Sequence, residues 1–202
     1  MKPNTYWELP PGYSLQREVK LPEDRSALKI MAVLQLVLAG ALILFGALRH
    51  PVREAFSMGA ARTAAAFCMT AAGIFLYFLA HEWVHGVFIR VFTGRSAAFG
   101  FELKKGMAYA YSKAYLPRIP YVIIALAPLT VWTALLGMLL GDVPESWFWY
   151  LYLIQIVNVS GAAGDLYVSW LTLGMPTETL ILDSGMEMRF YWPDGKKQKE
   201  TE

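Results

Sequence analysis

The sequence predicts an all-α integral membrane protein with four transmembrane helices and a small β-hairpin between the second and third helices. Two observations predict this class. The chain of 202 residues is 56% hydrophobic and only 17% charged, which is too apolar for an ordinary soluble domain. Its apolar residues also fall in four blocks, each long enough to cross about 30 Å of hydrocarbon as a helix. The predicted spans are residues 27–48, 63–92, 121–140 and 147–173.

The amino-terminal segment, residues 1–26, mixes charged residues with Pro10, Pro11 and Gly12, which break regular structure. We expect a surface strip or an ordered turn here rather than a domain. The apolar run that follows is too long for a signal-peptide core, so the first span is expected to be retained. Residues 27–173 then form one membrane core, and residues 174–202 form a tail.

Basic residues predict how the chain is oriented in the cell membrane. The segments predicted on the same side of the membrane as the amino terminus carry ten basic residues: Arg17, Lys20, Arg25, Lys29, Arg90, Arg95, Lys104, Lys105, Lys113 and Arg118. The segments on the opposite side carry three: Arg49, Arg53 and Arg62. Because cytoplasmic loops carry the excess of Lys and Arg, both termini and the hairpin are predicted to be cytoplasmic.

The central motif of the chain lies in the second span, where residues 81–85 read His-Glu-Trp-Val-His. On a helix, His81 and His85 lie on one face and can offer two imidazole nitrogens to one metal ion, with Glu82 beside them. Polar groups within a membrane span need compensation, because hydrocarbon offers no water to solvate them. The alternative is a structural polar cluster, or histidines bonded to backbone carbonyls.

Two other residue types that bind metals give weaker signals. His50 lies in a short polar loop next to Pro51, so a solvated histidine is the favoured interpretation. Cys68 is the only cysteine, which excludes a disulfide within the chain and a cysteine-based metal site.

Residues 97–113 are predicted to form the β-hairpin. Two short runs rich in aromatic residues flank the turn Lys104-Lys105-Gly106, immediately after the helix that carries the histidines. The hairpin either presents a strand edge to an extended peptide or caps the helices. The third span follows and contains Pro128, which kinks the helix and either opens room beside the metal or shapes packing.

The fourth span supplies a third ligand. Asp165 is its only acid, and Gln155, Asn158, Ala162 and Asp165 follow the spacing of one helix face. Residues 160–164 are small and favour close helix packing. His85 precedes the cytoplasmic end of its span by about 8 Å and Asp165 precedes its own by about 13 Å, so the two residues can meet at one level.

Two imidazoles and one carboxylate leave a fourth tetrahedral position for water, which is typical of catalytic zinc sites. The sequence therefore predicts Zn²⁺ bound by His81, His85 and Asp165, with Glu82 as the base that takes a proton from the attacking water. Asn158 either steadies the substrate carbonyl or oxyanion, or makes an interhelical hydrogen bond.

These motifs resemble two related families. The pattern His81-Glu82-x-x-His85 followed by Asn158 and Gly164-Asp165 is similar to the core of the site-2 protease intramembrane zinc metalloproteases. The whole chain, including Leu9 to Tyr13, more closely resembles small bacterial membrane proteins described as putative zincin peptidases. The resemblance implies zinc ligands at the two histidines and Asp165, and a catalytic base at Glu82. Gly161 stands where the site-2 protease signature has a proline.

The predicted function is a membrane-embedded zinc metalloprotease that hydrolyses a peptide bond in or near a transmembrane segment. Its expected partners are the lipid bilayer and a membrane protein or peptide substrate. A net charge of +2 is too small to indicate a nucleic-acid partner. The alternative is a non-proteolytic metal-binding protein that regulates or scaffolds a partner. A metal carrier is disfavoured because polar groups concentrate at one level. Asp183 and Glu187 follow the last span; a regulatory or metal-associated role is one interpretation, and a solvated tail is the favoured one.

Overall fold

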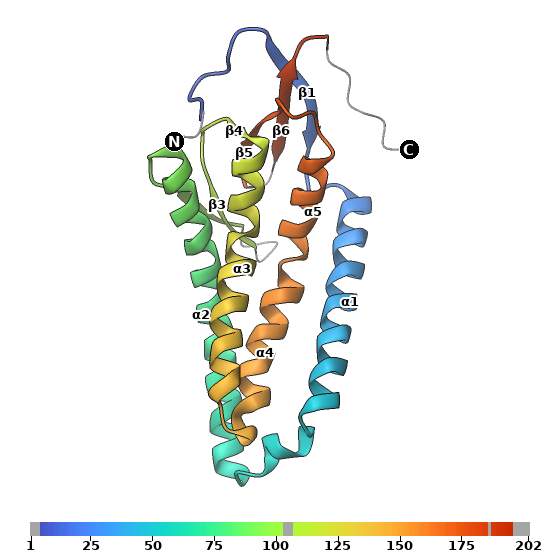
Figure 1. Cartoon of the computed structure of the whole chain (residues 1–202), viewed down its shortest axis with the longest axis vertical. Helices are drawn as coiled ribbons and strands as arrows, with labels where there is room; N and C mark the ends of the chain where they lie inside the picture. The colour runs from blue at the N-terminus through green and yellow to red at the C-terminus, as the bar shows by residue number, and fades with distance from the viewer. Residues whose placement is uncertain (1–4, 103–106, 186, 196–202) are drawn as a thin grey trace. The chain divides into compact units, whose positions relative to one another are not determined.

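The computed structural model describes residues 5–102, 107–185 and 187–195. The predicted turn at residues 104–106 lies outside the described residues. The described part is mostly helical and also contains two small β-sheets (Figure 1). Its helices are α1 (Arg25–Arg49), η1 (Val52–Phe56), α2 (Ala60–Thr93), α3 (Arg118–Asp142), α4 (Glu145–Gly161) and α5 (Ala163–Leu173). Its strands are β1 (Tyr13–Val19), β2 (Ala98–Glu102), β3 (Met107–Tyr111), β4 (Leu116–Pro117), β5 (Leu180–Asp183) and β6 (Met188–Pro193).

Four helical segments are long and apolar enough to cross a membrane. They are Arg25–Arg49, Ala60–Thr93, Arg118–Asp142 and Glu145–Leu173, and they contain the four predicted spans. Exposed large apolar side chains are numerous on α1 and α2, for example Leu36, Leu48 and Phe75. Outward apolar faces are what a lipid environment requires.

The fourth segment consists of two helices rather than the uninterrupted helix that the sequence predicted. α4 ends at Gly161 and α5 begins at Ala163, with Ala162 in a turn whose N–H donates to the carbonyls of Asn158 and Ser160. Glycine has a low helix propensity, and Gly161 lies at this point. The interruption places Asp165 in the first turn of α5.

The chain divides into two compact units, and the boundaries pass through α1, α2, α3 and the turn between α4 and α5. The first unit comprises Met1–Ile30, Glu82–Pro128 and Gly164–Glu202, and the second comprises Met31–His81 and Leu129–Ala163.

The second unit packs its helices around a buried aromatic cluster. Its members are Ala55, Ala66, Phe148, Trp149, Tyr150, Tyr152 and Ile156. Glycines allow close approach to α4: a Cβ on Gly46 would lie 2.5 Å from Tyr152 Cε1, and one on Gly73 would lie 2.9 Å from Ile154 Cδ1. Small residues at such contacts are typical of helices that pack in membranes.

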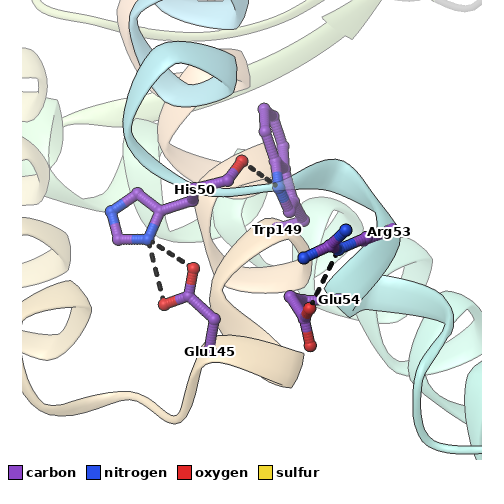
Figure 2. A network of polar contacts seen from close by, with 5 residues as sticks. All are labelled: His50, Arg53, Glu54, Glu145 and Trp149. Carbon is purple, nitrogen blue, oxygen red and sulfur yellow. Dashed lines mark hydrogen bonds and ion pairs between the residues drawn. The ribbon is translucent and has the colours of Figure 1, made fainter.

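A polar network ties the loop after α1 to the start of α4 within the second unit (Figure 2). His50 Nδ1 lies 2.9 Å from a Glu145 carboxylate oxygen, and its ring stacks on Phe148 with centroids 3.5 Å apart. Trp149 Nε1 donates to the His50 carbonyl at 3.2 Å. The third histidine of the chain therefore pairs with a carboxylate rather than being only a solvated loop residue, and it serves this local connection.

The first unit contains a four-stranded antiparallel sheet in the order β1-β6-β5-β4. β1 pairs with β6 from Tyr13↔Pro193 to Val19↔Met188, with an irregularity between Leu15 and Arg17. The prediction of a solvated tail is wrong for β5 and β6, because Ile181 and Phe190 are fully buried. The amino-terminal segment likewise contributes a strand, which the fold prediction of one hairpin did not include.

The second sheet of this unit is the antiparallel pair β2–β3, in register from Ala98↔Tyr111 to Glu102↔Met107. Two close contacts hold it. A Cβ on Gly86 of α2 would lie 2.6 Å from Phe99 Cζ, so the Phe99 ring rests directly on the α2 backbone. The Tyr109 ring similarly covers Gly185 in the turn between β5 and β6. The strand pair is thereby fixed both to the histidine-bearing helix and to the larger sheet.

Candidate metal centre

A cavity of about 190 Å³ in the first unit contains three of the predicted site residues. Glu82 and His85 reach it from α2, and Asp165 reaches it from α5. Residues 108–112, at and just after β3, form another part of its lining. The cavity therefore combines polar residues of the long apolar helices with residues of a strand.

His85 has a defined orientation. Its Nδ1 lies 3.0 Å from the carbonyl oxygen of Ile124 in α3. A carbonyl can only accept a hydrogen bond, so the proton of a neutral His85 ring is on Nδ1, and Nε2 carries the lone pair. A backbone carbonyl that fixes the tautomer in this way is the usual second contact of a histidine that binds a metal through Nε2.

The Nε2 atom of His85 lies 3.5 Å from Asp165 Oδ1. Their side chains are only 12% and 20% exposed, so water screens the two groups little. A lone pair and a carboxylate oxygen repel each other at this distance unless a cation lies between them. That cation is either a proton on Nε2 or a metal ion.

His81 precedes His85 by one turn of the continuous helix α2, and its ring is also oriented by a hydroxyl group. Tyr77 donates its hydroxyl hydrogen to Asn158 Oδ1 at 2.9 Å, and the same hydroxyl oxygen lies 2.9 Å from His81 Nδ1. Because Tyr77 has one hydrogen to donate, its oxygen accepts from His81 Nδ1–H. In a neutral His81 ring with this hydrogen bond, the lone pair is on Nε2.

Asn158 is fully buried in the second unit and makes hydrogen bonds to three helices. Besides accepting from Tyr77 of α2, it donates to Thr133 Oγ1 of α3 at 2.9 Å and to Gln155 Oε1 of α4 at 3.3 Å. The interhelical hydrogen bond that the sequence predicted as one alternative is thus present. The predicted contact with a substrate carbonyl stays a prediction.

Two further residues of the cavity lining are Tyr121, which the sequence did not indicate, and Asp183, for which a solvated tail was the favoured interpretation. Tyr121 lies in the first turn of α3 and donates its hydroxyl hydrogen to Asp183 Oδ2 at 2.6 Å, and the Gly185 N–H donates to Asp183 Oδ1 at 2.7 Å. Burial raises the pKa of Asp183 above its ordinary value, although the hydrogen bonds from Tyr121 and Gly185 act against this shift. The signal available in the sequence was an acid directly after the apolar run Leu-Ile-Leu.

A comparison with known families decides the affiliation of the chain. Residues 74–180, more than half of the sequence, match the profile of the family described as "Putative zincin peptidase". The chain belongs to this family. The zincin family suggests a zinc metallopeptidase, with zinc as the cofactor. No curated protein matches the chain, and no solved structure matches it.

The separation and the chemical type of two donor atoms, His85 Nε2 and Asp165 Oδ1, suit a bound zinc ion. Two ligands bound to one tetrahedral zinc at about 2.0–2.2 Å lie roughly 3.3–3.6 Å apart. The 3.5 Å separation of His85 Nε2 and Asp165 Oδ1 falls in this range. Imidazole nitrogen and carboxylate oxygen are also ligands that zinc accepts. The arrangement of this pair therefore suits the cofactor that the family implies.

Proposed function

We propose that this chain is a membrane-embedded zinc endopeptidase that hydrolyses a peptide bond in or near a transmembrane segment. The observation that carries the proposal is the His85–Asp165 pair, whose facing atoms call for a cation, in a cavity that Glu82 also lines. Four apolar helices supply the membrane setting. The relation to site-2 proteases, suggested by the sequence motifs, is part of this proposal.

The proposed zinc ligands are Nε2 of His81, Nε2 of His85 and Oδ1 of Asp165. The contacts of both rings through Nδ1, with Tyr77 and Ile124, support this assignment. Bound zinc would supply Lewis-acid chemistry, polarising a carbonyl and lowering the pKa of a water molecule toward neutrality. Asn158 acts on His81 through Tyr77, so its proposed role is to position a ligand.

Glu82 is the proposed general base and acid. Its carboxylate takes a proton from water as the water oxygen bonds to the carbonyl carbon and the carbonyl π electrons move to oxygen. When the carbon–nitrogen bond breaks, Glu82 returns that proton to the leaving amine nitrogen. Glu82 lines the cavity and lies in the same helix, α2, as the proposed ligands His81 and His85, and this position supports its role.

The proposed substrate is an extended peptide lying along β3. Among the described residues, β3 has a strand partner on one side only, β2, and residues 108–112 line the cavity. An unpaired strand edge can bind a peptide backbone without demanding one side-chain sequence. A cavity of about 190 Å³ has room for a peptide group and a neighbouring side chain, but not for a folded segment.

The direct test is Glu82→Gln in zinc-loaded protein reconstituted in lipid. We expect cleavage of a membrane peptide to fall by about 100- to 10,000-fold, since glutamine cannot accept the proton. Zinc content should stay at the wild-type level. Glu145→Gln, an equivalent change outside the cavity, serves as the control and should cleave normally.

Two results would contradict the proposal. Cleavage by Glu82→Gln at the wild-type rate would remove Glu82 from the chemistry. Zinc bound at full occupancy by a wild-type protein that cleaves none of a diverse set of membrane peptides would favour the alternative, a non-proteolytic metal-binding partner of another protein.

A further inference from the structure

The cavity contains a second polar pair that the proposed hydrolysis does not use. Tyr121 is only 6% exposed, and its hydroxyl makes the 2.6 Å hydrogen bond to Asp183. Both residues line the same cavity as Glu82, His85 and Asp165. A half-buried carboxyl group and a buried phenol group cost free energy unless they are paired, and here they pair with each other in the lining of the cavity.

A purely structural role for this pair is already filled by other contacts. The start of α3 is connected to β5 by the backbone pairing of β4 with β5, from Leu116↔Ile181 to Pro117↔Leu180. Arg118 also donates to the carbonyl of Met175 at 2.7 Å. An apolar pair could have completed this junction without a carboxyl group at position 183.

Asp183 and Tyr121 can form a relay of two hydrogen bonds, in which Asp183 donates to Tyr121 and Tyr121 donates to a third group. Burial raises the pKa of Asp183, which favours its neutral, proton-bearing form. If Asp183 bears the proton, the direction of this hydrogen bond reverses: Asp183 donates to the Tyr121 oxygen, which leaves the Tyr121 hydrogen for another acceptor in the cavity. Hydrogen bonds in such a chain strengthen one another in a site of low polarity.

We propose that Tyr121 donates a hydrogen bond to the carbonyl oxygen of the bound peptide as that oxygen gains negative charge, and that Asp183 is the residue that positions the Tyr121 hydroxyl. This inference rests on the proposed peptidase function. Tyr121 of α3 thereby takes the oxyanion-stabilising role that was one of the two roles predicted for Asn158 from the sequence. The proton is shared but not transferred, so no bond of Tyr121 or Asp183 breaks.

The test compares Tyr121→Phe with Tyr191→Phe, a buried tyrosine of β6 that is not part of the cavity lining. Tyr121→Phe should lower kcat by about 100- to 1,000-fold and leave KM and zinc content nearly unchanged. A phosphinic peptide, whose charged oxygens imitate the tetrahedral state, should bind this variant more weakly, whereas the matching amide peptide should bind equally. Tyr191→Phe should change none of these quantities.

Asp183 provides the second arm of the test. Asp183→Asn retains an N–H donor for the Tyr121 oxygen and should keep much more of kcat than Asp183→Ala does. Equal losses in the two Asp183 variants, or a Tyr121→Phe protein that matches wild type in kcat and phosphinic-peptide affinity, would overturn the inference while leaving the peptidase proposal intact. A wild-type protein that neither cleaves peptides nor binds the phosphinic peptide would overturn both.

Discussion

At the scale of single residues, the proposed site depends on groups that determine which ring nitrogen of each proposed histidine ligand carries the hydrogen. Tyr77 and the Ile124 carbonyl each contact an Nδ1 atom, so Nε2 is the atom that each histidine ring would offer to the proposed metal. Second contacts of this kind orient a ligand before the metal arrives. Their loss should weaken metal binding without removing any ligand.

Tyr77→Phe tests this idea. The variant keeps the ring of Tyr77 but loses the hydroxyl that links Asn158 to His81. We expect zinc affinity to fall by about 10- to 100-fold, measured by competition with a chelator. Tyr150→Phe is the matched control, because it removes the hydroxyl bonded to the Ala55 carbonyl and should leave zinc affinity unchanged. Equal zinc affinity in wild type and Tyr77→Phe would contradict the assignment.

Asp183 makes stability depend on pH. Since its pKa is raised, the folded protein holds the proton between the ordinary value, about 3.9, and the raised value, whereas the unfolded chain has lost it. The free energy of unfolding therefore decreases as pH rises through this window and stays lower above it. We expect metal-free wild type to show this decrease and Asp183→Asn to lack it. Thermal unfolding of both proteins across pH 4–8 is the measurement, and parallel profiles would contradict it.

At the scale of elements, composition predicted the helices but not the larger sheet. Long apolar blocks identify spans because each block alone must match the thickness of the membrane. β1 and β6 lie near opposite ends of the sequence, and no local sequence pattern predicts that the two strands pair. β5 and β6 were therefore assigned to a tail, and Asp183 with them. The motif at residues 81–85 was predictable because its spacing is local to one helix.

The turn between β5 and β6 gives an element-scale prediction. Gly185 has φ of +85°, and a Cβ there would also clash with the Tyr109 ring. We expect Gly185→Ala to lose about 2–6 kcal/mol of stability, from backbone strain and from displacement of Tyr109 together. Gly12→Ala is the control, because Gly12 has φ of +80° but nothing within 4 Å of the added Cβ.

Thermal unfolding of the two glycine variants in detergent separates these terms. The control should show the strain alone, and the difference between the variants should report the contact between Tyr109 and the turn. Equal destabilisation of Gly185→Ala and Gly12→Ala would show that the contact does not hold β3 in place.

At the scale of the whole molecule, the cytoplasmic location of both termini stays a prediction from the sequence. Four membrane crossings would return the chain to its starting side, to which the prediction assigns the excess of basic residues. We expect green fluorescent protein fused to the carboxyl terminus to be fluorescent in bacteria, and alkaline phosphatase fused after Asp142 to be active. The reverse pattern would contradict the orientation, but it would leave the ligand assignment unaffected.

Zinc binding tests the central claim most directly. The measurement is the zinc content of purified wild-type protein and of Asp165→Ala, determined by elemental analysis after the same removal of loosely bound metal. The proposed ligand set predicts about one zinc per wild-type chain and a large loss in Asp165→Ala, because only two ligands remain. A wild-type protein that retains no zinc, or an Asp165→Ala protein that retains as much as wild type, would contradict it.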